Sequence, residues 1–299
     1  MMLSICITTR NSNIESLISR LTDQAKELDI SSEILVAESG SDQNYSSMNE
    51  QLCTKRHIKY FKHNQHLSHG QMKNLLAQQA QGSYLLFLNG KNHITHRNYL
   101  QMFTEVMQPG VTIEGGTTAS GIKPDKPYQL HWMAMHNLLT FDADQRNQHP
   151  YYHLTTNNML IPRGIFLQHP ISDGDDYTEI LPYTYELKKN SVPVIHIDNP
   201  VSTNDYLPAL KFLVVTRKQM QQTATWLQKL TGPEKEHIGI PEFVKLTNSR
   251  KNRIKRLYKH LYRNHYISIM RKISDPEYNQ IKKYRNFRRL MLWEALKND

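Results

Sequence analysis

Short apolar runs alternate with helical patterns along the first ninety residues. Strand patterns occupy residues 3–7, 33–37, 57–62 and 84–88, and the last run is unbroken, as in a strand that is buried on both faces. Between them, apolar residues recur at the spacing of amphipathic helices over 14–28, 46–52 and 68–80. This alternation predicts an α/β fold with a mostly parallel central sheet, built from right-handed βαβ units and flanked by helices.

The same patterns predict where elements begin and how the chain continues. Ser12 and Glu15 have the spacing of a capping box, which predicts the Ser12 hydroxyl as the cap of the first helix. Further strands are predicted at 112–116, 155–163 and 193–197, and further helices at 128–139, 178–189 and 205–230. An acidic loop at 173–176 leads into the second of these helices.

Polar turns follow the first, second and fourth predicted strands. These turns are Thr8-Thr9-Arg10-Asn11, Glu38-Ser39-Gly40-Ser41-Asp42 and Asn89-Gly90-Lys91-Asn92. In open α/β sheets, ligands bind just outside the carboxyl ends of the strands. The sequence therefore predicts a ligand site at one edge of the sheet, although an ordinary solvent loop at 89–92 is an equal alternative.

Positive charge is concentrated near the end of the 299-residue chain. Residues 245–299 hold 16 Lys and Arg against four Asp and Glu, whereas residues 1–244 hold 21 against 23. We expect a near-neutral, catalytic-type domain at 1–231 and a basic, helical C-terminal extension at 232–299.

The extension mixes basic with aromatic and apolar residues. Arg250, Lys251, Arg253 and Lys255 stand among Leu257, Tyr258 and Tyr262, and a second basic cluster spans 282–289. Such a helix is able to lie on an anionic membrane surface. Nucleic acid ranks lower as a partner, because no binding motif is present. A solvated helical pair packed on the body is as good an explanation as either.

Cysteine usage and hydropathy indicate the compartment. The two cysteines, Cys6 and Cys53, cannot form a disulfide framework, and Cys6 lies inside a predicted strand. The N-terminal apolar run is too short for a signal peptide, and no run approaches the roughly 18 apolar residues of a membrane span. We expect a cytoplasmic protein, at most peripheral at the inner membrane face.

The order of the segments resembles that of a known family. Leu3-Ser4-Ile5-Cys6-Ile7-Thr8-Thr9-Arg10-Asn11, Glu33-Ile34-Leu35-Val36-Ala37-Glu38-Ser39-Gly40-Ser41, Gly82-Ser83-Tyr84-Leu85-Leu86-Phe87-Leu88 and Thr155-Thr156-Asn157-Asn158-Met159-Leu160-Ile161-Pro162 occur in the order found in family-2 inverting glycosyltransferases of the GT-A fold. The resemblance covers residues 2–230. It implies transfer of a sugar from a nucleotide-sugar donor to a glycan or glycolipid acceptor, in the assembly of surface polysaccharide.

The resemblance also implies a set of donor-binding residues. Thr8, Thr9, Arg10, Glu38, Ser39 and Lys73 would hold the nucleotide, and Asn89, Gly90 and Lys91 the diphosphate. Two positions depart from the family pattern. Ser39 replaces the second residue of an acidic pair, and Lys73 replaces an arginine, so that a cation is kept there.

The largest departure is at the metal site. The family has Asp-x-Asp holding a divalent cation where this chain has Asn89-Gly90-Lys91, and a family histidine falls at Thr203. Mg²⁺ or Mn²⁺ is expected for the family, but an amide and an ammonium do not replace two carboxylates. Either Lys91 takes over the electrostatic task of the metal, or the site is inactive and the fold serves as a scaffold that binds a sugar or a protein.

Inverting transfer needs a carboxylate that takes the proton of the acceptor hydroxyl. The family pair Glu-Asp becomes Glu179-Ile180 here, which makes Glu179 the first candidate for the base and Asp176 the second. Compensation of the helix dipole explains these acids equally well.

The acceptor side is predicted from fewer residues. Trp132, Asn157 and Asn158 are the candidates for acceptor binding, although Trp132 lies in a stripe of Met and aromatic residues that is more typical of a core. His63, His66 and His69 recur every third residue, but they lack a cysteine or carboxylate partner at ligand spacing, and we predict no zinc site there.

Overall fold

The computed structural model describes residues 2–172 and 180–231, together with residues 271, 273, 283–285, 287, 288 and 291. Contacts divide the chain into two compact units: residues 1–118 with 141–204, and residues 119–140 with 205–299. The boundary expected at residue 231 stays a prediction, because most of 232–299 lies outside the described part of the chain.

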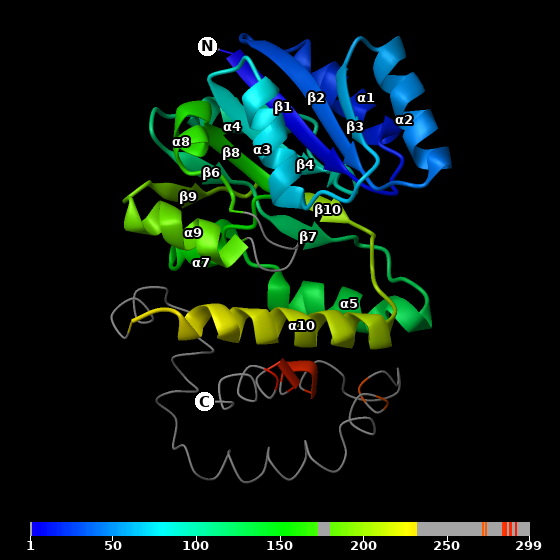
Figure 1. The fold of residues 1–299 in the computed structure, drawn as a ribbon, viewed down its shortest axis with the longest axis vertical. Helices are drawn as coiled ribbons and strands as arrows, with labels where there is room; N and C mark the ends of the chain where they lie inside the picture. The colour runs from blue at the N-terminus through cyan, green and yellow to red at the C-terminus, as the bar shows by residue number, and fades with distance from the viewer. Residues whose placement is uncertain are drawn as a thin grey trace. The chain divides into compact units, whose positions relative to one another are not determined.

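A seven-stranded sheet forms the centre of the first unit (Figure 1). Its strands are β1 (Met2–Thr9), β2 (Ser31–Ser39), β3 (Lys59–His63), β4 (Tyr84–Asn89), β6 (Thr112–Glu114), β8 (Asn158–Pro162) and β9 (Val194–His196), in the order β3-β2-β1-β4-β8-β6-β9. Only β8 runs antiparallel to its neighbours, β4 and β6. The predicted mostly parallel sheet is therefore confirmed.

Helices flank this sheet, and those at 15–25, 43–55, 69–79 and 180–189 fall where the apolar spacing predicts them. They are α1 (Glu15–Ala25), α2 (Gln43–Lys55), α3 (His69–Gln79), α4 (Tyr99–Val106), α6 (Ala143–Asn147), α7 (Pro150–His153), α8 (Arg163–Gln168) and α9 (Ile180–Lys189). The third predicted strand begins two residues late, at Lys59, because the chain leaves α2 through His57 in a left-handed conformation (φ 56°).

The predicted capping box at the first helix is wrong. Ile14 occupies the cap position of α1 without a side-chain hydrogen bond, and the amide of Glu15 donates to Asn13 Oδ1 at 2.9 Å instead. The Ser12 hydroxyl donates to the carbonyl of Gly90 at 3.2 Å, so it is engaged by a distant turn. A capping box does form at α3, between Ser68 and Gln71.

Two apolar clusters cover the two faces of the sheet. Alternate residues of β1 point to opposite faces, as strand geometry requires. Ile5 and Ile7 pack with residues of α1 and α4, whereas Cys6 packs with residues of α3 and α8. The same alternation decides which side of the sheet each polar residue at a strand end faces.

A second, three-stranded sheet joins β5 (His93–Ile94), β10 (Val201–Thr203) and β7 (Thr117–Ala119), in the order β5-β10-β7. β5 lies directly after the turn that follows β4, and it pairs antiparallel with β10 through Ile94 and Val201. The 89–92 turn is thereby held between the two sheets.

The second unit is helical in its described residues. It contains η1 (Lys126–Tyr128), α5 (Gln129–Ala134), η2 (Met135–Leu139) and α10 (Ala209–Gln228), so the predicted helix at 128–139 is divided into three. Phe212 of α10 stacks on Tyr284 with ring centroids 4.9 Å apart. Ile273, Phe287 and Met291 are buried in the same apolar cluster, so the described apolar residues of the basic extension face the interior of this unit.

No helix in the described ranges is both long enough and apolar enough to cross a membrane.

Candidate functional site

The carboxyl ends of three parallel strands meet at one edge of the central sheet, as the sequence predicts. Thr9 pairs with Glu38 across β1 and β2, and Thr8 pairs with Asn89 across β1 and β4. Because β8 is antiparallel, its first residue, Asn158, pairs with the last residues of β4. The predicted donor-binding turns and the predicted acceptor-binding asparagines therefore occupy the same edge.

The 89–92 turn is closed by its own amide side chains. The backbone N–H of Lys91 donates to Asn89 Oδ1 at 2.9 Å, and that of Asn89 donates to Asn92 Oδ1 at 2.6 Å. A Cβ atom on Gly90 would lie 2.7 Å from Thr9 Cβ and 2.9 Å from Ile14 Cγ2, which explains the glycine without any special backbone angle. The turn is therefore pressed against β1 and α1.

A chain of hydrogen bonds connects the 89–92 turn to Glu38 at the end of β2. Glu38 is buried, and its Oε2 accepts hydrogen bonds at 2.8 Å from both Asn49 Nδ2 and Tyr60 Oη. Asn49 Nδ2 also donates to the carbonyl of Ser12 at 2.9 Å, and the Ser12 hydroxyl donates to Gly90. Glu38 thus faces the α2 side of the sheet and acts on the turn through these residues.

Ser39 and Arg10 organise the loop before α3. The Ser39 hydroxyl donates to the carbonyl of Gln65 at 2.8 Å and accepts from the amide of Leu67 at 2.6 Å. Arg10 Nε donates to the carbonyl of Ser39 at 3.0 Å, and its Nη2 lies 3.1 Å from His66 Nδ1. Ser39 is buried, so of these residues Arg10 offers the more accessible polar group at this corner of the edge.

Thr8 and Thr9 face opposite sides of the sheet. Thr8 Oγ1 lies 3.1 Å from Nδ1 of His69, the first residue of α3, whereas Thr9 lies under Gly90 on the α1 side. Both side chains are buried. Their role in holding the nucleotide stays a prediction.

Lys73 reaches toward the segment that precedes β8. Its Nζ donates to Thr156 Oγ1 at 2.8 Å and to Asn157 Oδ1 at 3.2 Å, and the side chain is 2% exposed. The lysine is therefore a buried contact between α3 and the 155–157 segment.

The two asparagines predicted to bind the acceptor differ in exposure. Asn158 is fully buried; its Nδ2 donates to the carbonyls of Gly116 and Asn199 at 2.7 and 2.9 Å, and its Oδ1 accepts from Tyr99 Oη. These contacts use both amide hydrogens, so we assign Asn158 to the framework. Asn157 is half-buried and remains the candidate for acceptor contact.

The remaining predicted residues are described only in part. Trp132 belongs to the second unit, where its indole N–H donates to the carbonyl of Ser120 at 2.9 Å and its ring meets that of His136 edge-on. Glu179 and Asp176, the candidates for the base, lie outside the described residues. The described part of the chain holds no group of three or more His, Cys, Asp or Glu side chains arranged for a metal ion.

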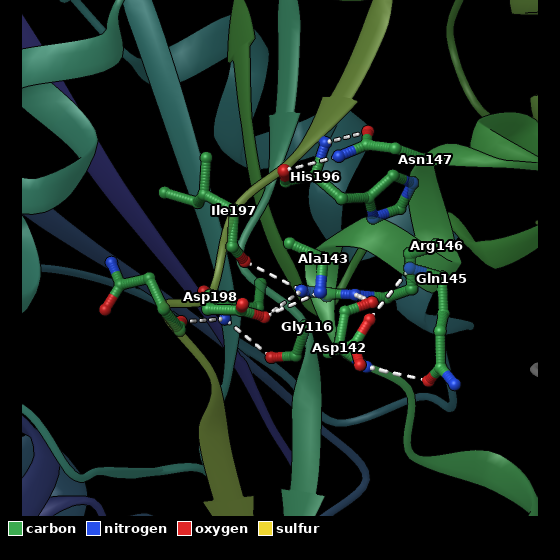
Figure 2. Close-up of polar contacts among 11 residues, drawn as sticks. Gly116, Asp142, Ala143, Gln145, Arg146, Asn147, His196, Ile197 and Asp198 are labelled. Atoms are coloured by element: carbon green, nitrogen blue, oxygen red, sulfur yellow. Dashed lines mark hydrogen bonds and ion pairs between the residues drawn. The ribbon is translucent and has the colours of Figure 1, made fainter.

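A group of buried charged residues at the same edge was not predicted. Glu114, the last residue of β6, is fully buried; its Oε1 accepts from Thr155 Oγ1 at 2.5 Å, and its Oε2 has no partner among the described residues. Arg146 is 5% exposed and lies over the backbone of Gly116 (Figure 2). The Glu-Gly-Gly sequence at the end of a predicted strand was the one signal for this group.

Arg146 fastens α6 to the segment after β9. Figure 2 shows its guanidinium beside Ile197 and Asp198; Nη2 donates to the carbonyl of Ile197 at 2.7 Å and lies 3.4 Å from Asp198 Oδ1. Asn147 pairs with both backbone groups of His196 at 3.0 and 2.8 Å, and so covers the outer edge of β9. The short helix α6 thereby closes the sheet at this end.

Burial controls the protonation of these groups. It raises the pKa of Glu114 from 4.5 to about 7, against the opposing effects of the Thr155 hydrogen bond and the charges of Arg146 and Lys73. Burial also lowers the pKa of His196 to about 4, partly offset by the carbonyl of Pro150. Burial thus brings the pKa of Glu114 into the neutral range of pH.

The comparisons with known proteins agree with this architecture. The sequence profile of glycosyl transferase family 2 matches residues 4–169, which is more than half of the chain. The protein therefore belongs to glycosyl transferase family 2. A search of curated proteins found no sequence match.

Solved structures of glycosyltransferases share the fold at low sequence identity. A mannosyltransferase from Pyrobaculum calidifontis, in complex with GDP-Man and Mn²⁺, matches with a TM-score of 0.56 and 10% identity over 99% of this chain and 86% of that one. Glucosyl-3-phosphoglycerate synthase from Mycobacterium tuberculosis, in complex with Mn²⁺, UDP and glucosyl-3-phosphoglycerate, matches with a TM-score of 0.52 and 12% identity over 75% of this chain and 79% of that one. TarS 1–349 from S. aureus, with UDP-GlcNAc, matches with 0.51 and 16% over 96% and 90%. These identities establish the GT-A fold and nothing finer.

Proposed function

We propose that this protein transfers a hexose from a nucleotide-sugar donor to a hydroxyl of a glycan or glycolipid acceptor, with inversion and without a divalent metal. The observation that carries the proposal is the convergence of the β1, β2 and β4 carboxyl ends with the start of β8 at one edge, within a family-2 chain. Ligands of open α/β sheets occupy this position.

In this proposal, the reaction is a direct displacement. The acceptor hydroxyl oxygen forms a bond to the anomeric carbon while the bond from that carbon to the diphosphate oxygen breaks, and the electron pair leaves with the diphosphate. The hydroxyl proton goes to a carboxylate, for which Glu179 is the first candidate and Asp176 the second. Arg10 would contact the nucleotide, and the 89–91 turn the diphosphate.

The donor set at the turn does not fit Mg²⁺ or Mn²⁺. Both ions prefer anionic oxygens, whereas the turn offers an amide whose Oδ1 already accepts the Lys91 amide hydrogen. An ammonium at position 91 would stabilise the charge that develops on the leaving diphosphate, which is the task of the metal in relatives that bind Mn²⁺. We therefore assign that task to Lys91.

A second candidate function is a non-catalytic scaffold that binds a sugar or a protein at the same edge. The internal engagement of Glu38, Ser39 and Asn89 favours it, because these side chains already have partners within the protein. The scaffold would keep the fold of the family without turnover.

A panel of UDP-, GDP- and TDP-sugars separates the two functions. The purified full chain is incubated with each donor, in EDTA and in Mn²⁺, and donor hydrolysis and the melting temperature are measured. The transferase predicts that one nucleotide sugar is hydrolysed in EDTA and raises the melting temperature. A panel without hydrolysis or stabilisation would favour the scaffold and contradict the transferase.

We also propose that the protein acts at the cytoplasmic face of the membrane, held by the basic residues of 250–263. The excess of Lys and Arg in the extension supports this location, because anionic lipids attract such clusters. Sedimentation with phosphatidylserine vesicles, but not with phosphatidylcholine vesicles, is the expected result. Equal recovery with both vesicle types would contradict it.

A further inference from the structure

The segment Thr155–Asn157 carries backbone strain at the edge of the sheet. Thr156 has φ 60°, in the left-handed region that β-branched residues rarely adopt. It is fully buried and lies two residues before Asn158, the first residue of β8. Conformations of this kind persist only where the surrounding structure enforces them, and they cluster at functional sites.

Two buried charged residues enforce this conformation from different elements. From α3, Lys73 Nζ donates to Thr156 Oγ1 at 2.8 Å and to Asn157 Oδ1 at 3.2 Å. From β6, Glu114 Oε1 accepts from Thr155 Oγ1 at 2.5 Å. Three consecutive residues are thus held on two sides by groups that are costly to bury.

The lysine contact also fixes the orientation of the Asn157 amide. With its Oδ1 held by Lys73, the amide must direct its two N–H donors to the opposite side. No partner for Nδ2 is found within 2–172 and 180–231, and the residue is half-buried. The segment adjoins the end of β4, where Leu88 pairs with Asn158, so these donors lie at the edge that carries the 89–92 turn.

We propose that Lys73 and Glu114 are positioning residues, which hold the 155–157 segment preformed so that Asn157 donates a hydrogen bond to an oxygen of the acceptor. The inference rests on the proposed transferase function and adds to it the class of group recognised, a hydroxyl or anionic oxygen. It also gives Lys73 a role on the acceptor side, in place of the nucleotide contact predicted from its position in the family pattern.

Asn157→Asp tests the proposal most sharply. The aspartate keeps the contact with Lys73 and presents an oxygen where Asn157 presents N–H donors. The donor is the nucleotide sugar that the wild-type protein hydrolyses. The acceptor is chosen from a panel of p-nitrophenyl glycosides as one to which the wild-type protein transfers the sugar. We expect the KM for the glycoside to rise about tenfold or more, a larger change than in donor hydrolysis, with the melting temperature unchanged.

Lys73→Met tests the positioning role, with Lys55→Met, an exposed lysine at the end of α2, as the control. We expect a similar rise in KM for Lys73→Met and faster amide hydrogen exchange across 155–158, whereas the control keeps wild-type values. An unchanged KM in both Asn157→Asp and Lys73→Met, or an equal loss of hydrolysis and transfer, would overturn the proposal.

Hydrogen exchange keeps this test separate from the fate of the proposed function. If wild type neither hydrolyses a donor nor transfers to a glycoside, the transferase function fails. Exchange across 155–158 in Lys73→Met and in Glu114→Met, which removes the acceptor of the Thr155 hydrogen bond, still reports on the positioning role. Wild-type exchange rates in both variants would overturn it.

Discussion

The two halves of the sheet edge use polar residues in opposite ways. On the donor side, Glu38, Ser39 and Asn89 stand near positions where the family carries acids, and they hydrogen-bond within the protein. On the proposed acceptor side, the ionisable side chains of Glu114 and Lys73 are buried around Thr156, which has a left-handed backbone conformation. The departures at the nucleotide and metal positions, Ser39 and Asn89, are on the donor side, whereas the buried lysine and the left-handed threonine are on the acceptor side. A fold kept only as a scaffold has no need of such costs, and this contrast favours a working acceptor site.

Adding a methyl group at Gly116, next to Arg146, should destabilise the acceptor side more than any other change considered. A Cβ atom on Gly116 (φ 86°) would lie 2.6 Å from Arg146 Cζ, so Gly116→Ala should lower the free energy of unfolding by about 3 kcal/mol or more. Gly110 has a similar φ of 80° but open space, and Gly110→Ala should cost only about 1 kcal/mol. Urea denaturation measures both; equal losses would show that the arginine is easily displaced.

Protonation of Glu114 should make the acceptor side sensitive to pH. In the folded protein the pKa of this carboxyl is about 7, whereas in the unfolded chain it is near 4.5. The contribution of Glu114 to the free energy of unfolding is therefore fully present below pH 4.5 and is lost as the pH rises to 7. The groups that face it are Arg146 and Lys73, with Tyr99 and His196 nearby. The free energy of unfolding should therefore fall by up to about 3 kcal/mol over this interval.

Glu114→Gln should remove this slope, because glutamine does not titrate and still accepts from Thr155. Glu105→Gln, an exposed position on α4, serves as the control. Urea denaturation of the three proteins from pH 5 to 7.5 measures the difference. Parallel curves for wild type and Glu114→Gln would contradict the raised pKa.

Crowding the 89–92 turn should perturb the donor side with a smaller effect on stability. Gly90→Ala would bring a Cβ atom within 2.7 Å of Thr9 Cβ, and we expect a loss of about 1–2 kcal/mol together with weaker nucleotide binding. Gly164→Ala, in open space at the start of α8, should change neither. Thermal denaturation with and without nucleotide distinguishes the two variants. Wild-type nucleotide binding by Gly90→Ala would show that the 89–92 turn is not part of the donor site.

Much of the fold follows from local pattern. The spacing of apolar residues over 3–88 is sufficient to predict four strands and three helices, because each of these elements buries one face or both. Strand alternation also predicts that Glu38 and Ser39 face opposite sides, so their different partners are explained by the same rule. The Ser12 capping box failed because a carbonyl 78 residues away takes the hydroxyl, which no local pattern contains.

The candidate site was less predictable, since its contacts join distant segments. Lys73 meets Thr156 across 83 residues, and Thr155 meets Glu114 across 41. The local sequence determines neither the direction of the Lys73 side chain on its helix nor the burial of Glu114 at the end of its strand. The resemblance to the family implied a nucleotide contact for Lys73, whereas its contacts with Thr156 and Asn157 are known from the structure alone.

The electrostatic role that we assign to Lys91 at the donor site is that of a metal ion. Its most direct test is the turnover of the nucleotide sugar that wild type hydrolyses, measured in EDTA for Lys91→Ala and for Lys26→Ala, a control lysine that is 69% exposed at the end of α1. We predict a loss of about 100-fold or more in kcat for Lys91→Ala and wild-type turnover for Lys26→Ala. Wild-type turnover by Lys91→Ala, or loss of wild-type activity in EDTA, would contradict the claim.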